Sequence, residues 1–302
     1  MFSVTILGNN SALPAYNRHP TAQMVHLNEQ NILLDCGEGT QMRMLEFKVK
    51  RNNLNYIFIS HLHGDHYLGL AGLINTLNLT GRSEPLNLFA PPPLEEILRL
   101  QFANGNTKLN FDLRFFPLPE EAGPLVETST FRVSTFLTEH RVTCHGFLIE
   151  EIKKPRSIVP EKTQEFGIPF DYYPALQNGA DYISEDGELI IPNEILTEEA
   201  PLPKSYAYCA DSRFTTSFLP YIENADTIYH ETTYLDDLRE KAESRYHSTT
   251  KQAATIATLA HAKQLLIGHF SSMYDDLTPF QLEAASVFPN SIRTQEGETY
   301  NI

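Results

Sequence analysis

The sequence has few cysteines, few basic residues and no long apolar run. Its three cysteines, Cys36, Cys144 and Cys209, show no paired spacing. We therefore expect buried thiols rather than disulfides, which suits a reducing cytoplasm. No apolar stretch is long enough to span a bilayer, and the N-terminus lacks the basic start and cleavage site of a signal peptide. These absences predict a cytoplasmic protein that does not insert into membranes.

Positive charge is also scarce, since 23 lysines and arginines stand against 38 aspartates and glutamates, for a formal net charge of −15. This balance excludes a generally basic nucleic-acid-binding surface but leaves room for a local basic patch. The composition is otherwise that of a globular protein, with 41% hydrophobic and 20% charged residues. The length of 302 residues suffices for one large α/β domain or two smaller ones.

What the sequence does contain is a dense group of metal-binding side chains directly after a short apolar run. His61, His63, Asp65 and His66 follow the pattern H-x-H-x-D-H. His61 and His63 alternate, so both can point the same way from an extended chain, while Asp65 and His66 lie beyond a glycine and can face a second point nearby. Four such residues do not easily share one tetrahedral ion, so the pattern indicates two adjacent ions that need further ligands. Imidazole and carboxylate ligands favour Zn²⁺, with Mn²⁺ or Fe as alternatives.

Further ligand-type residues stand at the ends of predicted strands. The chain alternates short strands and helices, which predicts an α/β fold, and His140, Asp211 and His269 each follow a strand. We interpret His145, close to His140, as structural, because a single histidine most often is. Asp35 ends another strand and is expected either to cap its turn or to accept a hydrogen bond from a metal-ligating histidine.

One segment breaks the alternation of strands and helices. Residues 153–178 contain four prolines, a glycine and four basic residues. This composition predicts an inserted, projecting arm rather than part of the core. Since no clear linker divides the chain, we expect a single domain over residues 1–302 with an arm at about 153–178.

The order of the ligand-type residues resembles the metallo-β-lactamase superfamily, whose fold is an αββα four-layer sandwich with a two-metal site along one edge. Four further stretches look like the short form of ribonuclease Z, the endonuclease that removes the 3′ trailer of precursor tRNA. They are D-C-G-E-G-T-Q at 35–41, S-H-x-H-G-D-H-x-x-G-L at 60–70, H-E-T-T-Y at 230–234 and H-S-T at 247–249. The H-x-H-x-D-H pattern alone indicates the superfamily, and the last two stretches narrow it to this family. The resemblance covers nearly the whole chain.

The resemblance implies a metal-binding role for each matching residue. It implies two zinc ions per subunit. One ion would be held by His61, His63 and His140, and the other by Asp65, His66 and His269. Asp211 would bridge the two ions. Such a pair of ions can activate water and stabilise a phosphate group as it is cut.

The resemblance also implies the catalytic residues. Asp65 would act as general base on the attacking water, and His247, held by Glu231, would give a proton to the leaving ribose 3′ oxygen, so that the tRNA keeps a 3′-hydroxyl. Without the resemblance, Glu231 and His247 fit equally well as an ordinary strand-end glutamate and a helix-capping histidine.

Substrate binding and assembly follow from the same resemblance, which implies a homodimer with precursor tRNA as its partner. The basic side chains expected to contact RNA are Arg18, Lys153, Lys154, Arg156 and Lys162. Three stretches differ from the usual family pattern: the arm has no Gly-Pro pair, His19 rather than asparagine follows Arg18, and residues 271–274 read Ser-Ser-Met-Tyr without the family's arginine.

Two other functions stay open at this point. The same metal site can serve a hydrolase of small phosphodiesters or sulfate esters. A non-catalytic zinc-binding module that interacts with RNA or protein is the third possibility, and it predicts bound zinc without turnover.

Overall fold

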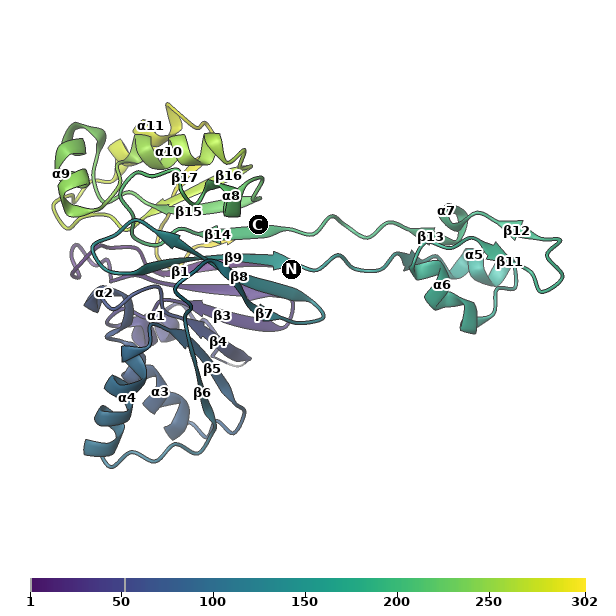
Figure 1. Ribbon diagram of the computed structural model, residues 1–302, viewed down its shortest axis with the longest axis horizontal. Coiled ribbons are helices and arrows are strands. Elements are labelled where there is room, and N and C mark those ends of the chain that lie inside the picture. Colours follow the sequence, from purple (N-terminus) through teal and green to yellow (C-terminus); the bar gives the residue numbers. More distant parts are fainter. Residues whose placement is uncertain (1, 52) are drawn as a thin grey trace. The chain divides into compact units, whose positions relative to one another are not determined.

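The chain forms two seven-stranded sheets in the computed structural model, which describes residues 2–51 and 53–302 (Figure 1). The first sheet has the order β18 (Thr299–Asn301), β1 (Phe2–Gly8), β2 (Ala22–Leu27), β3 (Gln30–Leu34), β4 (Leu54–Phe58), β5 (Leu86–Ala90) and β6 (Leu113–Pro117). Strands β3 to β6 run parallel, and the other neighbours are antiparallel. Parallel neighbours need crossover connections, which contain α1 (Thr40–Glu46), α2 (Gly64–Tyr67), α3 (Leu70–Leu79) and α4 (Pro93–Asn104).

The second sheet repeats this arrangement with the C-terminal part of the chain. Its order is β17 (Ser291–Arg293), β16 (Gln264–Gly268), β15 (Thr227–Glu231), β14 (Ser205–Tyr208), β9 (Cys144–Glu151), β8 (Phe131–Thr138) and β7 (Gly123–Glu127). Strands β14 to β17 are parallel. Their crossovers contain α8 (Leu219–Ile222), η2 (Asp236–Leu238), α9 (Arg239–Arg245), α10 (Thr250–Leu259) and α11 (Thr278–Ala285).

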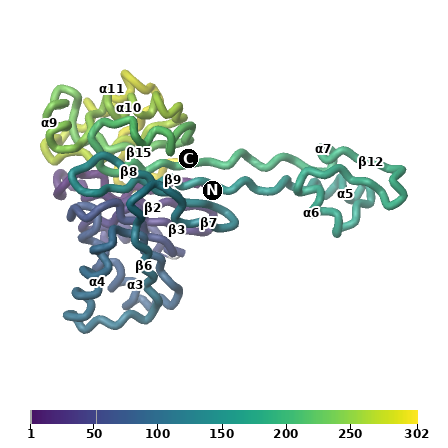
Figure 2. Tube along the Cα trace, viewed as in Figure 1, coloured from purple at the N-terminus to yellow at the C-terminus, as the bar shows by residue number. Residues whose placement is uncertain are grey.

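The two sheets pack face to face, with helices on their outer faces (Figures 1 and 2). Apolar residues of α1, α3 and α4 share one buried cluster with the first sheet, and residues of α8, α10 and α11 share another with the second. Between the sheets, the rings of Phe58 and Phe147 lie 5.2 Å apart, and the Tyr206 hydroxyl donates to Gln23 Oε1 at 2.5 Å. The predicted αββα four-layer fold is therefore confirmed, with the carboxyl ends of parallel strands available to carry a site.

Residues 128–132 and 150–203 form a second compact unit. It contains β10 (Ser157–Ile158), α5 (Pro160–Glu165), η1 (Phe170–Tyr172), α6 (Tyr173–Gln177), β11 (Tyr182–Ile183), β12 (Ile190–Ile191), α7 (Asn193–Leu196) and β13 (Thr197–Glu198). Its small core is built from Ile168, Leu176, Ile191 and Leu196.

This unit includes the whole segment predicted as an arm but continues to residue 203. The extension has a physical reason, because Ile191 and Leu196 complete its core. We propose that the unit is an insertion into a single domain, since the chain leaves the second sheet at β9 and returns at the neighbouring strand β14.

The three cysteines are buried and free, which confirms the expectation of thiols. Within residues 2–51 and 53–302, no helix combines the length and apolar character that a membrane crossing requires.

Candidate metal centre

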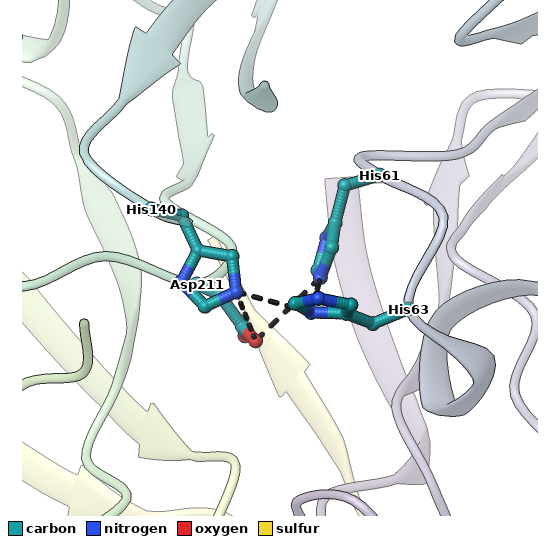
Figure 3. A group of neighbouring side chains, drawn as sticks. All are labelled: His61, His63, His140 and Asp211. Atoms are coloured by element: carbon teal, nitrogen blue, oxygen red, sulfur yellow. Dashed lines mark hydrogen bonds and ion pairs between the residues drawn. The ribbon is translucent and has the colours of Figure 1, made fainter. Parts of the chain in front are cut away.

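The candidate ligands lie on loops that follow strands of both sheets. Strand β4 ends at Phe58, β14 at Tyr208 and β16 at Gly268, and each is followed within three residues by a candidate ligand. Because parallel strands end at the same edge of a sheet, these loops meet. Figure 3 shows His61 and His63 on one side of the resulting site, with His140 and Asp211 opposite.

The H-x-H-x-D-H segment has the local structure that its spacing predicts. The chain is extended at His63, and the short helix α2 begins directly after it, with Asp65 in its first turn and His66 buried. This segment is locked against the loop after β3, because a Cβ at Gly69 would lie 2.1 Å from the carbonyl oxygen of Gly37. Only glycine permits so close an approach.

Three imidazoles and one carboxylate form the first group, which we call the His61 group (His61, His63, His140 and Asp211). His63 Nδ1 lies 3.0 Å from His61 Nε2 and 3.1 Å from His140 Nε2. Asp211 Oδ2 lies 3.7 Å from His61 Nε2 and 3.8 Å from His140 Nε2 (Figure 3). Ligands 2.0–2.1 Å from a tetrahedral ion stand about 3.3 Å apart, so these four atoms have suitable spacing.

A second group, the Asp65 group (Asp65, His66 and His269), lies beside the first. Asp65 Oδ2 is 3.6 Å from His66 Nε2 and 3.4 Å from His269 Nε2. Asp211 contributes here through its other oxygen, because Oδ1 lies 3.4 Å from His66 Nε2 and 3.2 Å from His269 Nε2. One carboxylate therefore faces both groups, one oxygen to each.

Three polar atoms that face the Asp65 group lack hydrogen-bond partners. Among the described residues, His66 Nε2, Asp211 Oδ1 and His269 Nε2 are buried without a hydrogen bond. Leaving such atoms unsatisfied is costly, and lone pairs that converge on one point suit a cation. The mixture of imidazole and carboxylate ligands suits Zn²⁺, Mn²⁺ or Fe. The two clusters are consistent with a two-metal site.

In four of the rings the far nitrogen is held by a hydrogen bond, which turns the other nitrogen toward the two groups. His61 Nδ1 lies 3.0 Å from Ser60 Oγ, and His66 Nδ1 lies 2.7 Å from Asp35 Oδ2. His140 Nδ1 lies 2.9 Å from the Tyr246 carbonyl, and His269 Nδ1 lies 3.0 Å from Thr233 Oγ1. Such contacts fix the orientation and tautomer of a metal-ligating imidazole.

Asp35 is the buried acceptor behind the H-x-H-x-D-H segment. It accepts from the Ser60 amide at 2.7 Å, the Ser60 hydroxyl at 2.8 Å, His66 Nδ1 at 2.7 Å and the Tyr208 hydroxyl at 2.5 Å. Asp35 therefore accepts from a candidate ligand histidine and from the loop that carries it, whereas its partners Ser60, His66 and Tyr208 all lie outside its own turn. Its φ of 56° and that of His269, 59°, are in the left-handed region, as strained backbone at functional sites often is.

Charge inside the site depends on burial and on the carboxylates. Burial lowers the pKa of His61, His63 and His140, which keeps these rings neutral and ready to bind a cation. Burial acts the same way on His66, but the carboxylates of Asp211, Asp35 and Asp65 outweigh it and raise its pKa well above the ordinary range. A cation at the Asp65 group therefore has to displace a proton from His66.

Glu231 and His247 form a second polar arrangement beside the two groups. Glu231 Oε1 accepts from His247 Nδ1 at 2.8 Å and the Ser212 amide at 2.9 Å, and Oε2 accepts from the Thr233 hydroxyl at 2.6 Å and its amide at 3.2 Å. Burial alone would lower the pKa of His247, but the carboxylates of Glu231, Asp211 and Asp65 raise it to about 9. His247 is therefore protonated at neutral pH in the metal-free protein.

A cavity of about 300 Å³ opens onto the groups. It is lined by Ser11, Ala12, Pro20, Glu38, His63, Gly64, Asp65, Leu68, Arg141, Asp211 and His247. Candidate ligands and the Glu231-bound histidine thus face the same space.

The predicted substrate-binding residues have different surroundings. Arg18 does not line this cavity, because its Nε donates to Asn10 Oδ1 at 2.9 Å and its guanidinium also donates to the carbonyls of Tyr274 and Asp275. Lys153, Lys154 and Arg156 line a hollow of about 430 Å³ within the second unit.

Arg156 and Lys162 each have an acidic partner. Arg156 is 3.1 Å from Glu199, and Lys162 is 2.8 Å from Glu165. The structure thus gathers three of the five predicted RNA contacts and gives Arg18 a role in holding its own loop.

Among the residues at the site that were not predicted from the sequence, three stand out. Thr233 joins Glu231 to His269, Tyr208 donates to Asp35, and Arg141 lines the cavity. Thr233 lies inside the H-E-T-T-Y stretch, but its residue type gave no signal. His145 is buried 3.1 Å from Thr135 Oγ1, burial lowers its pKa to about 4, and it belongs to neither group, as its structural interpretation requires.

Comparison with known proteins finds relatives that match nearly the whole chain and a family model that matches its first half. The chain is 40% identical over 297 residues to a ribonuclease Z from Parabacteroides distasonis, covering 98% of this chain and 97% of the relative. It is 38% identical to a ribonuclease Z from Cytophaga hutchinsonii, covering 100% of this chain and 96% of the relative. One family model, described as anti-Pycsar protein Apyc1, matches residues 2–154.

Solved structures show the same fold. Human tRNase Z, short form, superposes with a TM-score of 0.72 at 23% identity, covering 99% of each chain. The metallo-β-lactamase fold protein YhfI from Bacillus subtilis gives a TM-score of 0.69 at 22% identity, covering 100% of this chain and 99% of that one. These likenesses confirm the metallo-β-lactamase fold.

Proposed function

The chain belongs to the ribonuclease Z family, and we propose that it cuts precursor tRNA at two zinc ions. Members of this family are metal-dependent endonucleases that process tRNA 3′ ends. Over residues 2–154 the chain also belongs to the family of the anti-Pycsar protein Apyc1. Hydrolysis of one phosphodiester would release the trailer and leave a 3′-hydroxyl on the tRNA. The position of Asp211 carries this proposal, because its two oxygens face two groups of candidate ligands.

The seven side chains would hold the ions in the arrangement that the two groups define. The His61 group would bind one ion and the Asp65 group the other, with Asp211 shared. When bound, two such ions lower the pKa of a water molecule and supply positive charge for the phosphate group.

Asp65 would accept the proton of the attacking water. Its carboxylate lines the cavity, and Oδ2 accepts from the Ala12 amide at 2.7 Å, which fixes its orientation. In the metal-free protein, burial alone would raise the pKa of Asp65, but the neighbouring His66 and a hydrogen bond from His269 lower it, which favours the ionised carboxylate.

His247 would give a proton to the ribose 3′ oxygen as the bond between phosphorus and that oxygen breaks. An alkoxide is a poor leaving group, so a positioned acid contributes strongly. Glu231 holds Nδ1, and its carboxylate raises the pKa of His247 against the effect of burial, which favours the protonated ring that a proton donor requires.

The finer points of assembly are proposals of the same kind. We propose a homodimer because the family resemblance implies one. We also propose that Lys153, Lys154 and Arg156 contact the tRNA backbone, which their common hollow supports. Three buried, free cysteines support a reducing, cytoplasmic environment.

The decisive experiment incubates the purified protein with a 3′-extended precursor tRNA and maps the cut. We expect one cut that leaves a 3′-hydroxyl, its loss with a chelator and its return with added Zn²⁺. Bis(p-nitrophenyl) phosphate, tested in parallel, reports the bare metal chemistry. Cleavage of this small diester without any cut in the tRNA would favour the small-phosphodiester function, and bound zinc without either activity would favour the binding module.

A further inference from the structure

Arg141 stands beside the candidate metal centre without an assigned role. It follows His140 in the loop between β8 and β9, and its side chain is exposed at the cavity that also contains Asp65 and His247. Of the eleven residues that line this cavity, Arg141 is the one lysine or arginine, whereas Glu38, Asp65 and Asp211 are acidic.

The guanidinium of Arg141 is available for a ligand. Within residues 2–51 and 53–302 it has no hydrogen bond or ion pair. The nearby Arg213 differs, because it forms ion pairs with Glu139 and Glu243. Glu139, the acidic neighbour of His140, is thus paired with Arg213, and the Arg141 side chain lines the cavity.

We propose that Arg141 binds a phosphate group of the RNA that flanks the one being cut. This inference rests on the proposed function. The phosphate that is cut would meet the two cations and His247, but a flanking phosphate would meet acidic walls on a protein of net charge −15. A guanidinium offers a planar pair of donors that matches two phosphate oxygens.

The first test compares R141A with the wild-type protein on two substrates. We expect kcat/KM for precursor tRNA to fall about tenfold, mostly through KM, because one charge-assisted contact is lost. Hydrolysis of bis(p-nitrophenyl) phosphate, which has no flanking phosphate, should stay within about twofold. The slope of log kcat/KM against log salt concentration should become shallower by about 0.7, as expected for one phosphate contact on a single strand.

Two variants serve as controls. R99A removes the same charge from the exposed face of α4, where Arg99 has Glu96 as its partner, and should behave like the wild type on both substrates. R141K keeps the charge without the planar fork and should recover part of the loss. Equal zinc content and equal melting temperatures show that the variants are folded.

A chemical change in the substrate identifies the phosphate. Precursor tRNA with one uncharged methylphosphonate, placed at either linkage beside the cut, is tested with the wild type and with R141A. At one of the two positions we expect about a tenfold loss in the wild type and no additional loss in R141A, which is the signature of a direct contact.

Each other result overturns the inference. Additive losses at both linkages, unchanged cleavage by R141A, or an equal loss on the small diester would exclude a contact with a flanking phosphate. A wild-type protein that cuts the small diester but no precursor tRNA would overturn the proposed function and this inference together. If the wild type cuts tRNA but shows no coupling, the inference alone fails.

Discussion

Two buried carboxylates, one from each half of the fold, organise the site in parallel ways. Asp35 follows β3 of the first sheet, and Glu231 ends β15 of the second. Each accepts four hydrogen bonds, including one from a hydroxyl that also contacts a candidate ligand histidine. Ser60 connects Asp35 to His61 in this way, and Thr233 connects Glu231 to His269.

The difference lies in the imidazole that each carboxylate holds directly. Asp35 holds His66, whose free nitrogen is buried and faces Asp65 and Asp211. Glu231 holds His247, which lines the open cavity. The same carboxylate–imidazole pair can thus fix a metal ligand where the ring is enclosed and supply a proton where the ring meets substrate.

Removal of His247 is the strongest test of this comparison. In H247A, kcat for precursor tRNA should fall about 10²- to 10⁴-fold, because a positioned acid is lost from a reaction with a poor leaving group. Zinc content, measured by atomic absorption, should stay at the wild-type level. A large loss of zinc would place His247 on the metal-binding side and end the distinction from His66.

The pH dependence of stability separates the two pairs in the metal-free protein. The pKa of His247 is raised to about 9 in the fold, against about 6.5 in an unfolded chain. Its stabilising contribution is therefore complete below about pH 6.5 and is lost as the pH rises through about 9, with an upper size of about 3 kcal/mol.

Urea unfolding between pH 6 and 9.5 in the presence of a chelator measures this loss. E231Q removes the carboxylate and should flatten the dependence of the free energy of unfolding on pH. Some slope should persist in E231Q, because the raised pKa of His66 acts in the same direction. Parallel curves for E231Q and the wild type would show that the Glu231–His247 pair does not titrate in this range.

A change at Asp35 should affect metal binding instead of proton transfer. D35N leaves an amide group facing four donors, so the orientation of His66 is lost, and zinc affinity should fall about 10- to 100-fold. Excess Zn²⁺ should restore the activity of D35N but not that of E231Q. Competition with a chromogenic chelator gives the affinity, and equal recovery of both variants would contradict the assignment.

The sequence predicts the metal-binding side chains of this site better than the hydroxyl groups that hold them. His61 and His63 could be placed together because extended chain brings alternate side chains to one side. The convergence of His140, Asp211 and His269 could be expected from their positions at strand ends and from the family resemblance. Thr233 and Tyr208 could not, because hydroxyl groups occur in many strands and only the tertiary contacts with Glu231 and Asp35 distinguish them.

Other features depend on contacts between distant segments. The sequence does not distinguish Arg141 from Arg213, because the place of Arg141 at the cavity and the pairing of Arg213 with Glu139, 74 positions away, both depend on the fold. The second unit extends to residue 203 because Ile191 and Leu196 complete its core, which the composition of residues 153–178 alone does not show.

The smallest expected effect concerns the Thr233 hydroxyl, which connects Glu231, the partner of the proposed proton donor, to the candidate metal ligand His269. Thr233 Oγ1 donates to Glu231 Oε2 at 2.6 Å and lies 3.0 Å from His269 Nδ1. T233V keeps the shape but removes both contacts, so kcat and zinc affinity should each fall by less than about tenfold, the worth of one hydrogen bond. T232V is the matched control, because the neighbouring Thr232 hydroxyl donates to the Gly268 carbonyl at 3.1 Å and contacts neither Glu231 nor His269. If T233V lowers kcat but not zinc affinity, the Glu231–Thr233 contact serves only proton transfer. If T233V lowers both kcat and zinc affinity and T232V lowers neither, Thr233 couples the proton donor to a metal ligand.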